Sequence, residues 1–463
     1  MNIQLTYNRR QTTTTNVGGL LIGSEHPVRI QTMANTSTND IEGSVAQAKR
    51  CIDAGAELLR FTTQGIREVE SLSQIHQQLH ANRFNTPLVA DIHFQSDVAD
   101  AAAKVVEKVR INPGNYIDPA RKFKQIDYTD EEYQTELQRL RARFVQLLNI
   151  CKEHKTAIRL GVNHGSLSDR IMSHYGDTPE GMVESCMEFL RVAVAENFQD
   201  IVLSIKASNT LVMVTTVRLL VWQMAEEGMM FPLHLGVTEA GEGEDGRVKS
   251  AVGIGALLAD GIGDTIRVSL SEAPEKELPV AQALVDYFAD NQSVRYAHDT
   301  QVRIEDHTVY YTNSDTDWAL FQLHAAAECG CLLWDHHCTE LVLNNDHFAA
   351  EDLERLSKDI LQAARVRMYK TEYISCPGCG RTLFDLEQTI AQVKAATSHL
   401  QGLKIGIMGC IVNGPGEMAD ADYGYVGAGR GKVSLYRGKE CVLKNIPQEE
   451  AVTQLLALIE RKV

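Results

Sequence analysis

The sequence predicts an α/β fold: a parallel (β/α)8 TIM barrel, then an intervening insert, then a small α/β domain. Three observations support this. Eight short β-rich runs alternate with amphipathic helical stretches over the first 270 residues or so, the rhythm weakens afterwards, and the last hundred residues are long enough for a domain of their own. A doubly wound open sheet uses the same alternation but rarely has eight repeats. We expect a barrel at residues 1–274, the insert at 275–366 and the final domain at 367–463.

Each expected barrel strand is a short run rich in branched apolar residues. The runs are Val28–Met33, Leu58–Thr62, Pro87–Phe94, Lys108–Asn112, Ala157–His164, Asp200–Ser208, Pro232–Glu239 and Asp264–Leu270. The connection from Gly114 to Lys155 is longer than usual. Its apolar spacing predicts a helix packed on the outside of the barrel, through Leu137, Leu140, Phe144, Leu147 and Leu148.

Seven of the eight runs carry polar or charged residues in their later part. In a barrel these strand ends converge on one mouth, where barrel enzymes place their chemistry. One such residue more often only caps the layers of the barrel, but cations at the same end of several strands favour a site. The residues are Arg60, Asp91, His93, Arg110, Asn112, Arg159, Asn163, Lys206, Thr238, Glu239, Arg267 and Ser269.

The net charge of the chain limits the kinds of molecule that it can bind. The formal net charge is −16, so a nucleic-acid backbone would repel the chain, and we find no basic stripe that would overcome this. A few cations focused in a cleft still suit a small anionic substrate. We find no secretory signal and no apolar run long enough to span a membrane, which predicts a cytoplasmic protein without a membrane partner. In that compartment, ten cysteines serve metals or catalysis more often than disulfides.

The strongest local signal is the sequence CPGCG, which places Cys376 and Cys379 at the spacing of two thiolates that grip one metal centre. The proline and glycine between them suit a tight turn. Cys410 follows after an expected helix and strand, in GCIVNGPGE. Three cysteines leave a four-cysteine metal site incomplete. The turn at Gly414–Gly416 can aim Glu417 at the metal, where a carboxylate would be a weak, displaceable ligand of an iron–sulfur cluster.

Other interpretations of the cysteines stay open. The pair at Cys376 and Cys379 also suits a redox dithiol, although no thioredoxin-like unit surrounds it, or a structural zinc site with one more ligand. The remaining cysteines are expected to pack as small apolar residues, and a second metal near the last three is the less favoured alternative. These cysteines are Cys51, Cys151, Cys186, Cys441, Cys329, Cys331 and Cys338, the last three with His336 and His337.

At these motifs the sequence resembles a known family. The blocks YISCPGCGRTLFDL, GCIVNGPGEMADADYGYVG, VADIHF, VRINPGN, HLGVTEAGEGEDGRVKSA and GIGDTIRVSL together resemble the 4-hydroxy-3-methylbut-2-enyl diphosphate synthases of the methylerythritol phosphate pathway. The block NHGSLSDRIMSHYGDTPEGMVES is similar to the long, plant-type branch. That branch has a large extra domain, whereas the stretch at 275–366 is short, which implies a reduced insert.

The resemblance implies a barrel that binds 2-C-methyl-D-erythritol 2,4-cyclodiphosphate and a domain that holds a [4Fe–4S] cluster. Its implied product is 4-hydroxy-3-methylbut-2-enyl diphosphate, and its implied electron donor is reduced flavodoxin or ferredoxin. The implied cluster ligands are Cys376, Cys379, Cys410 and Glu417; the diphosphate clamp is Arg60, Arg110, Arg159, Lys206, Arg267 and Ser269; His93, Asn112 and Asn163 contact substrate, and Glu239 donates a proton.

The family also implies two ways to assemble the site. In its compact branch the cluster domain covers the barrel of a partner subunit, so a homodimer is one expectation. In the long branch, one chain closes on itself. Either way the cluster domain must move over the barrel, and we expect a hinge near Val366–Glu372.

Overall fold

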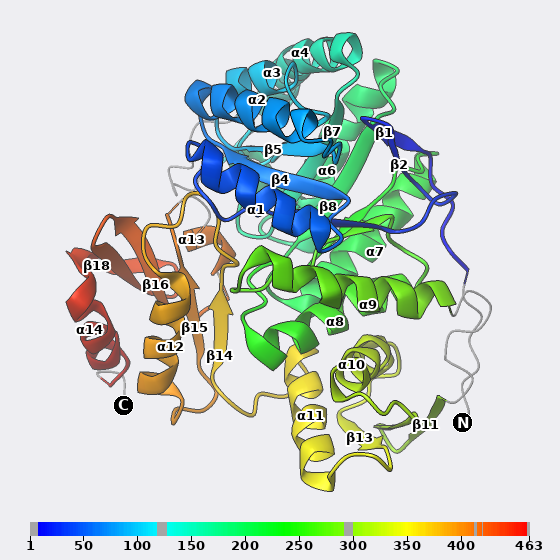
Figure 1. Ribbon diagram of the computed structural model, residues 1–463, viewed down its shortest axis with the longest axis vertical. Helices are drawn as coiled ribbons and strands as arrows, with labels where there is room; N and C mark the ends of the chain where they lie inside the picture. Colours follow the sequence, from blue (N-terminus) through cyan, green and yellow to red (C-terminus); the bar gives the residue numbers. More distant parts are fainter. Residues whose placement is uncertain (1–7, 118–126, 291–299, 412–413, 419, 461–463) are drawn as a thin grey trace.

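Eight parallel strands surround a common core in the first part of the chain (Figure 1). The computed structural model describes residues 8–117, 127–290, 300–411, 414–418 and 420–460. The strands run in the order β8-β7-β6-β5-β4-β3-β10-β9. The backbone N–H of Leu203 in β8 donates to the carbonyl of Pro232 at 2.9 Å, next to a parallel bridge with Leu233, and so brings the two ends of the sheet together. The strands are β3 (Arg29–Met33), β4 (Leu58–Thr63), β5 (Leu88–Ile92), β6 (Lys108–Ile111), β7 (Ala157–Asn163), β8 (Ile201–Lys206), β9 (His234–Leu235) and β10 (Thr265–Ile266).

Helices surround this barrel on the outside. A Thr129 capping box begins α4, where the Thr129 hydroxyl accepts from the Glu132 N–H and the Glu132 carboxylate accepts from the Thr129 N–H. The inner side of α4 buries Leu140, Phe144 and Leu147, as its sequence spacing predicted. The helices are α1 (Ile41–Asp53), α2 (Ile66–Ala81), α3 (Ser96–Ala102), α4 (Asp130–His154), α5 (Asp169–His174), α6 (Pro179–Ala195), α7 (Thr210–Glu226), α8 (Gly243–Ala259) and α9 (Glu277–Asp290), with a short 3₁₀ turn η1 (Pro274–Lys276).

A hairpin covers the end of the barrel where the strands begin. It consists of β1 (Thr15–Val17) and β2 (Leu20–Ile22), paired antiparallel. Val17 and Ile22 are fully buried, and they pack with the apolar residues that open four barrel strands. This apolar plug closes the end of the barrel opposite to the carboxyl ends of the strands. The strand residues in it are Leu58, Val89, Ala157 and Val202.

The insert is a small βαβ unit preceded by a hairpin strand. Strand β11 (Gln301–Glu305) pairs antiparallel with β12 (Thr308–Thr312), and β12 pairs parallel with β13 (Glu340–Asn344). The crossover between the parallel strands is α10 (Trp318–Asp335), and α11 (Ala350–Ala363) follows β13. Figure 1 shows this unit beneath α8. The expected strand at HTVYYTNSD and the expected helix at EDLERLSKDILQAARVRM are therefore confirmed.

Glycines bring α8 and α10 unusually close together. A methyl group added at Gly255 would lie 2.3 Å from Cβ of Ala327 and 2.5 Å from its Cα. On the other helix, a methyl at Gly330 would lie 2.9 Å from Cγ1 of Val252. Close approach of two helix backbones needs small residues at the crossing point. The insert is therefore packed directly onto a barrel helix.

The C-terminal domain is a five-stranded sheet with its two long helices on one face. Its strands run in the order β14-β15-β16-β17-β18, parallel from β14 to β16 and antiparallel afterwards. Alternate strand residues face opposite sides, so Ile405 and Tyr425 pack against α12 and α14 while Ile374 and Val426 pack with Met418 on the other face. The elements are β14 (Glu372–Ser375), α12 (Leu386–Thr397), β15 (Lys404–Met408), α13 (Gly414–Glu417), β16 (Tyr423–Gly429), β17 (Lys432–Arg437), β18 (Glu440–Pro447) and α14 (Gln448–Glu460).

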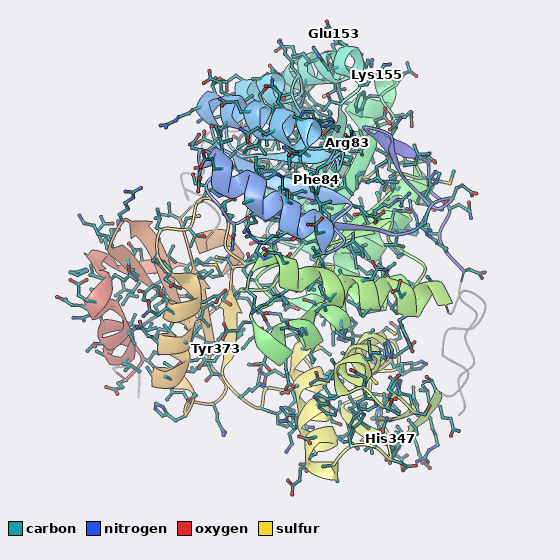
Figure 2. All side chains as sticks on the ribbon, viewed as in Figure 1. Arg83, Phe84, Glu153, Lys155, His347 and Tyr373 are labelled. Carbon is teal, nitrogen blue, oxygen red and sulfur yellow. The ribbon has the colours of Figure 1, made fainter. Side chains whose placement is uncertain are left out.

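Ion pairs hold the start of β14 to its surroundings. Glu372 accepts from Lys249 of α8 at 2.8 Å and from Arg365 at 2.6 Å, and Arg365 also reaches Asp420 at 2.8 Å. Next to them, the hydroxyl of Tyr373, labelled in Figure 2, lies 2.8 Å from that of Thr397 in α12. The segment where we expect a hinge is therefore fixed to the barrel on one side and to the C-terminal domain on the other.

The barrel and the C-terminal α/β unit confirm the predicted fold class. The division at residues 274 and 366 stays a prediction, and α9, which begins at Glu277, packs on β3 and α8 as the last helix of the barrel does. Within the described part of the chain, no helix combines the length and the apolar character that crossing a membrane requires.

We expect Gly255→Val to destabilise the protein by about 1–3 kcal/mol, because the added side chain has no room against Ala327. Thermal unfolding followed by circular dichroism measures the change. Gly429→Val is the matched control, since an added Cβ there meets nothing closer than 3.9 Å. Equal melting temperatures for the two variants would contradict the packing argument.

Candidate active site

Five cations from five barrel strands and their ends meet at the mouth of the barrel. Arg60, Arg110 and Arg159 lie within β4, β6 and β7, Lys206 ends β8, and Arg267 follows β10. None is more than 7% exposed. Burying like charges together is unfavourable unless negative charge compensates them. The arrangement therefore suits an anion bound between them.

Burial and mutual repulsion both act on these cations. Burial, and then the neighbouring Arg60 and Arg267, hold the pKa of Lys206 well below its usual range. Burial also lowers the pKa of Arg159, with Arg60 and Arg110 adding to the effect. Burial lowers the pKa of Arg60 to about 10 despite the attraction of Asp91. An anion entering this cavity would oppose the repulsion and favour the charged form of each group.

Asp91 organises one side of the cavity. Arg110 donates through Nη1 to Asp91 Oδ1 at 3.1 Å and to Nε2 of His93 at 2.6 Å, and through Nη2 to Oδ1 of Asn163 at 2.9 Å. Burial would raise the pKa of Asp91, but Arg60 and Arg110 outweigh it and hold that pKa well below its usual range. Burial and Arg110 together lower the pKa of His93 to about 3. His93 is therefore a neutral ring held in place by a charged pair.

Glu277 organises the opposite side. Its two carboxylate oxygens accept from Nε and Nη2 of Arg267 at 3.2 and 3.0 Å. The same carboxylate also accepts from the Thr32 hydroxyl at 2.8 Å and from the Leu270 N–H at 3.1 Å. A two-pronged contact of this kind fixes the plane of a guanidinium as well as its place. Glu277 thereby fixes the orientation of the Arg267 guanidinium.

Three cysteines of the C-terminal domain face the same space. Cys376 and Cys379 lie in the loop between β14 and α12, where Gly378 has a φ of 75°. Such a positive φ explains why glycine is present in this turn. Cys410 follows β15, and the N–H of Gly409 donates to Sγ of Cys376 at 3.2 Å. Burial raises the pKa of the Cys376 thiol.

One cavity therefore has walls from both domains of a single chain. The barrel contributes the cations and the C-terminal domain contributes the thiols. The lining residues are Met33, Arg60, Asp91, His93, Arg110, Arg159, Asn163, Ser204, Lys206, Thr238, Glu239, Arg267 and Ser269 from the barrel, and Cys376, Pro377, Gly378, Cys379, Arg381, Thr382, Met408, Gly409, Cys410 and Gly414 from the C-terminal domain.

The two domains touch at defined points around this cavity. The Ser271 hydroxyl donates to the carbonyl of Cys376 at 2.9 Å. The loops at Gly165 and Gly416 meet backbone to backbone, since a Cβ added at Gly165 would lie 2.2 Å from the carbonyl oxygen of Gly416. Arg381 extends from the C-terminal domain to within 3.7 Å of Asp91. These contacts place the thiols over the barrel mouth.

Comparison with known proteins agrees with this arrangement. Residues 12–282 match the GcpE TIM-barrel domain, and residues 372–461 match the GcpE protein C-terminal domain. The chain belongs to the GcpE family. The resemblance seen in the sequence motifs is thus confirmed, and both walls of the cavity lie within the matched regions.

Relatives of this GcpE family member match over nearly the whole chain. A 4-hydroxy-3-methylbut-2-en-1-yl diphosphate synthase (flavodoxin) of Phocaeicola vulgatus is 48% identical over 601 aligned positions, covering 98% of each chain. A protein of the same name from Leptospira interrogans is 37% identical and covers 98% of this chain and 97% of its own. Because the alignments are longer than this 463-residue chain, the relatives contain segments that it lacks.

Most of the residues proposed from the sequence line the cavity, with two exceptions. Asn112 is buried to one side, where its amide donates to the Ser166 hydroxyl at 3.1 Å and its oxygen accepts from the Gly114 N–H at 3.0 Å. The backbone of Glu417 belongs to α13, but its side chain lies outside the described part of the structure.

The other cysteines lie away from the cavity lining. Six are buried, three of them in α1, α4 and α6 as expected, and Cys441 is half-buried in β18. Three of them, Cys329, Cys331 and Cys338, belong to the main hydrophobic core, as the packing interpretation predicts. The buried six are Cys51, Cys151, Cys186, Cys329, Cys331 and Cys338.

Arg381 and Thr382 line the cavity but were not proposed from the sequence. They follow the CPGCG motif directly, so their position beside two expected ligands was an available signal. Met33 was also missed, and its sulfur accepts from Arg60 at 2.8 and 3.1 Å. An apolar side chain at a strand end gives no such signal in a sequence.

We expect the stability of the protein to fall as the pH drops below about 6.5, partly because His93 stays neutral in the fold. Its folded pKa of about 3 lies below its ordinary value of 6.5, so the unfolded chain binds the proton first and acid favours unfolding. His93→Gln should flatten the fall in urea midpoint between about pH 6.5 and pH 4. The exposed His154→Gln is the control. If the urea midpoint falls with pH equally in the wild type and in His93→Gln, His93 does not contribute to the pH dependence of stability.

Proposed function

We propose that this GcpE family member reductively opens the ring of 2-C-methyl-D-erythritol 2,4-cyclodiphosphate to give 4-hydroxy-3-methylbut-2-enyl diphosphate. The observation that carries the proposal is the single cavity with buried cations on one wall and three thiols on the other. In the reaction a ring C–O bond to phosphate breaks and one hydroxyl leaves as water. Two electrons and the accompanying protons are consumed, so the enzyme is an oxidoreductase.

The names of the relatives support both the product and the electron donor. Their name specifies the diphosphate product and flavodoxin. We propose reduced flavodoxin, or a ferredoxin of similar potential, as the donor for this chain. Because one chain supplies both walls of the cavity, this arrangement requires no partner subunit. The cytoplasmic location stays a prediction.

The donor set at the thiol wall fits a [4Fe–4S] cluster. Three cysteine thiols line one wall of the cavity, and the Gly409 N–H donates to Sγ of Cys376. Cysteine thiolates hold such clusters, and hydrogen bonds to their sulfurs tune the reduction potential. When bound, the cluster would supply the two electrons.

We propose Glu417 as the fourth, displaceable ligand. Gly414, three residues earlier, lines the cavity beside the thiols. The short helix α13 carries both residues. The Gly165–Gly416 contact holds this helix against the barrel loop after β7.

The cations at the barrel mouth bind and orient the diphosphate. Arginines offer two parallel donors to a phosphate, and Arg267 is already fixed in one plane by Glu277. Gly236 leaves room for Lys206, since an added Cβ there would lie 2.7 Å from Nζ. Ser269, His93 and Asn163 add neutral hydrogen-bonding groups to the same wall. The substrate is thereby oriented between the two domains.

Glu239 is the proposed proton donor for the departing hydroxyl. It is 1% exposed, lines the cavity, and has a φ of 49°, which is unfavourable for a residue with a side chain. General acid catalysis requires the proton donor to lie beside the bound substrate, and Glu239 lines the cavity that would hold it.

Arg381 is a further proposed contact to the diphosphate, supplied by the C-terminal domain. Its side chain is 8% exposed and lies near Asp91, which Arg110 already binds. A phosphate in the cavity would compete with Asp91 for this guanidinium. Binding of the substrate would then favour the position in which the thiols lie over it.

Anaerobically purified protein, assayed with reduced flavodoxin and the cyclic diphosphate, tests the proposal. We expect iron and sulfide in the protein, an electron paramagnetic resonance signal that changes with substrate, and the diphosphate product. Zinc without iron would instead support a non-redox barrel enzyme with a structural zinc. An intact cluster without turnover would support a sensor and refute the enzyme.

Lys206→Ala and Glu239→Gln should lose activity in different ways. Losing the ammonium should lower kcat/KM by about tenfold to a hundredfold through weaker binding. Losing the proton donor should lower kcat by about a hundredfold or more while KM changes little. Steady-state kinetics with the cyclic diphosphate separate the two. Unchanged rates in both variants, with the cluster intact, would exclude these roles.

Arg381→Ala should raise KM by about tenfold and leave the cluster signal of the substrate-free protein unchanged. Arg381→Lys should recover only part of the affinity, because lysine lacks the two-pronged geometry. Arg430→Ala, at an exposed position of the same domain, is the control. If Arg381→Ala binds substrate as the wild type does, Arg381 belongs only to the contact between the domains.

A further inference from the structure

Two histidines lie one helical turn apart on α2, away from the active-site cavity. His76 and His80 are four residues apart, so they project from the same side of the helix. Their ring centroids are 4.2 Å apart, with planes inclined at 39°. His76 is half-buried and His80 is exposed. Two imidazoles in this arrangement can bind one metal ion as a chelating pair.

A fixed carboxylate faces this pair. Glu107 comes directly before β6 and lies at the end of the barrel that the β1–β2 hairpin covers. Its Oε1 lies 2.7 Å from Nε2 of His76, and its Oε2 accepts from the Leu88 N–H at 2.9 Å. Its Cγ packs against Gly18 of the hairpin, where an added Cβ would lie 2.3 Å away. The carboxylate is therefore held from three sides before any ion arrives.

The free oxygen of Glu107 is positioned as a ligand oxygen usually is. The Leu88 N–H donates to Oε2, which leaves Oε1 beside Nε2 of His76. A hydrogen bond of this kind from the backbone is the usual support of a metal-binding carboxylate.

We propose that His76, His80 and Glu107 form a binding site for one divalent transition-metal ion, with Zn²⁺ as the best match. Their ligand atoms all lie within 4.8 Å of one another. Bonds of about 2.0–2.2 Å in a tetrahedral site separate ligand atoms by about 3.3 Å. The ion would displace the proton shared by His76 and Glu107 and widen that contact slightly. His80 would turn in from the exposed side, and water would occupy the fourth position.

The site would link parts of the barrel that are distant in sequence. It would connect the last two turns of α2 to Glu107, directly before β6 and beside the Gly18 turn of the hairpin. This is the end of the barrel away from the cations and thiols. The role is therefore structural, and it neither requires nor affects the proposed reaction.

Equilibrium dialysis against micromolar Zn²⁺ tests the site with the full-length, anaerobically purified protein. The measurement compares wild type with His76→Gln/His80→Ala. We expect the double variant to bind one zinc ion fewer per chain, because zinc on the cysteines is common to both proteins. Zinc should also raise the melting temperature of the wild type more than that of the double variant. His154→Ala, at an exposed position on α4, is the control and should match the wild type.

Single variants and spectroscopy complete the test. Glu107→Gln and His80→Ala should each weaken this one zinc site by at least about tenfold. X-ray absorption at the zinc edge, taken as the difference between wild type and double variant, should show nitrogen and oxygen ligands without sulfur. Equal zinc content in the wild type and the double variant would overturn the proposal. A difference spectrum dominated by sulfur would also overturn it.

Discussion

Burying five cations around one cavity is the constraint on which the rest of this molecule depends. Arg60, Arg110, Arg159, Lys206 and Arg267 are nearly inaccessible to solvent, and their mutual repulsion must be offset within the fold. Asp91 and Glu277 provide part of this compensation, and both do so with defined geometry. The remaining positive charge is the basis of the proposal that the cavity binds an anion. Arg381 of the C-terminal domain adds a further cation, 3.7 Å from Asp91.

The sequence predicted the barrel well because its signals are local and repeated. Eight apolar runs, seven of them with polar residues in their later part, are what parallel strands produce when they are buried along their length and end at one mouth. For the same reason the residue pattern alone was enough to group Arg60, Arg110, Arg159, Lys206 and Arg267. The CPGCG spacing was equally local. Each of these features is encoded within a few residues of one strand or turn.

Features that depend on distant contacts could not be predicted in this way. Glu277 orients Arg267 from the start of α9, within a segment that the sequence assigned to the insert. Asn112 has the residue type and position of a substrate contact, yet its amide supports the loop at Ser166. Arg381 follows the cysteine motif, but its role beside Asp91 exists only once two domains meet. Side-chain direction and domain placement are decided by packing, which a single sequence pattern does not record.

The hairpin of β1 and β2 limits the routes into the barrel. Val17 and Ile22 close one end of it with apolar side chains, so within the described residues the open end is the one at the carboxyl ends of the strands. Substrate and product of the proposed reaction would therefore pass through the same opening, beside the Gly165–Gly416 contact with the C-terminal domain.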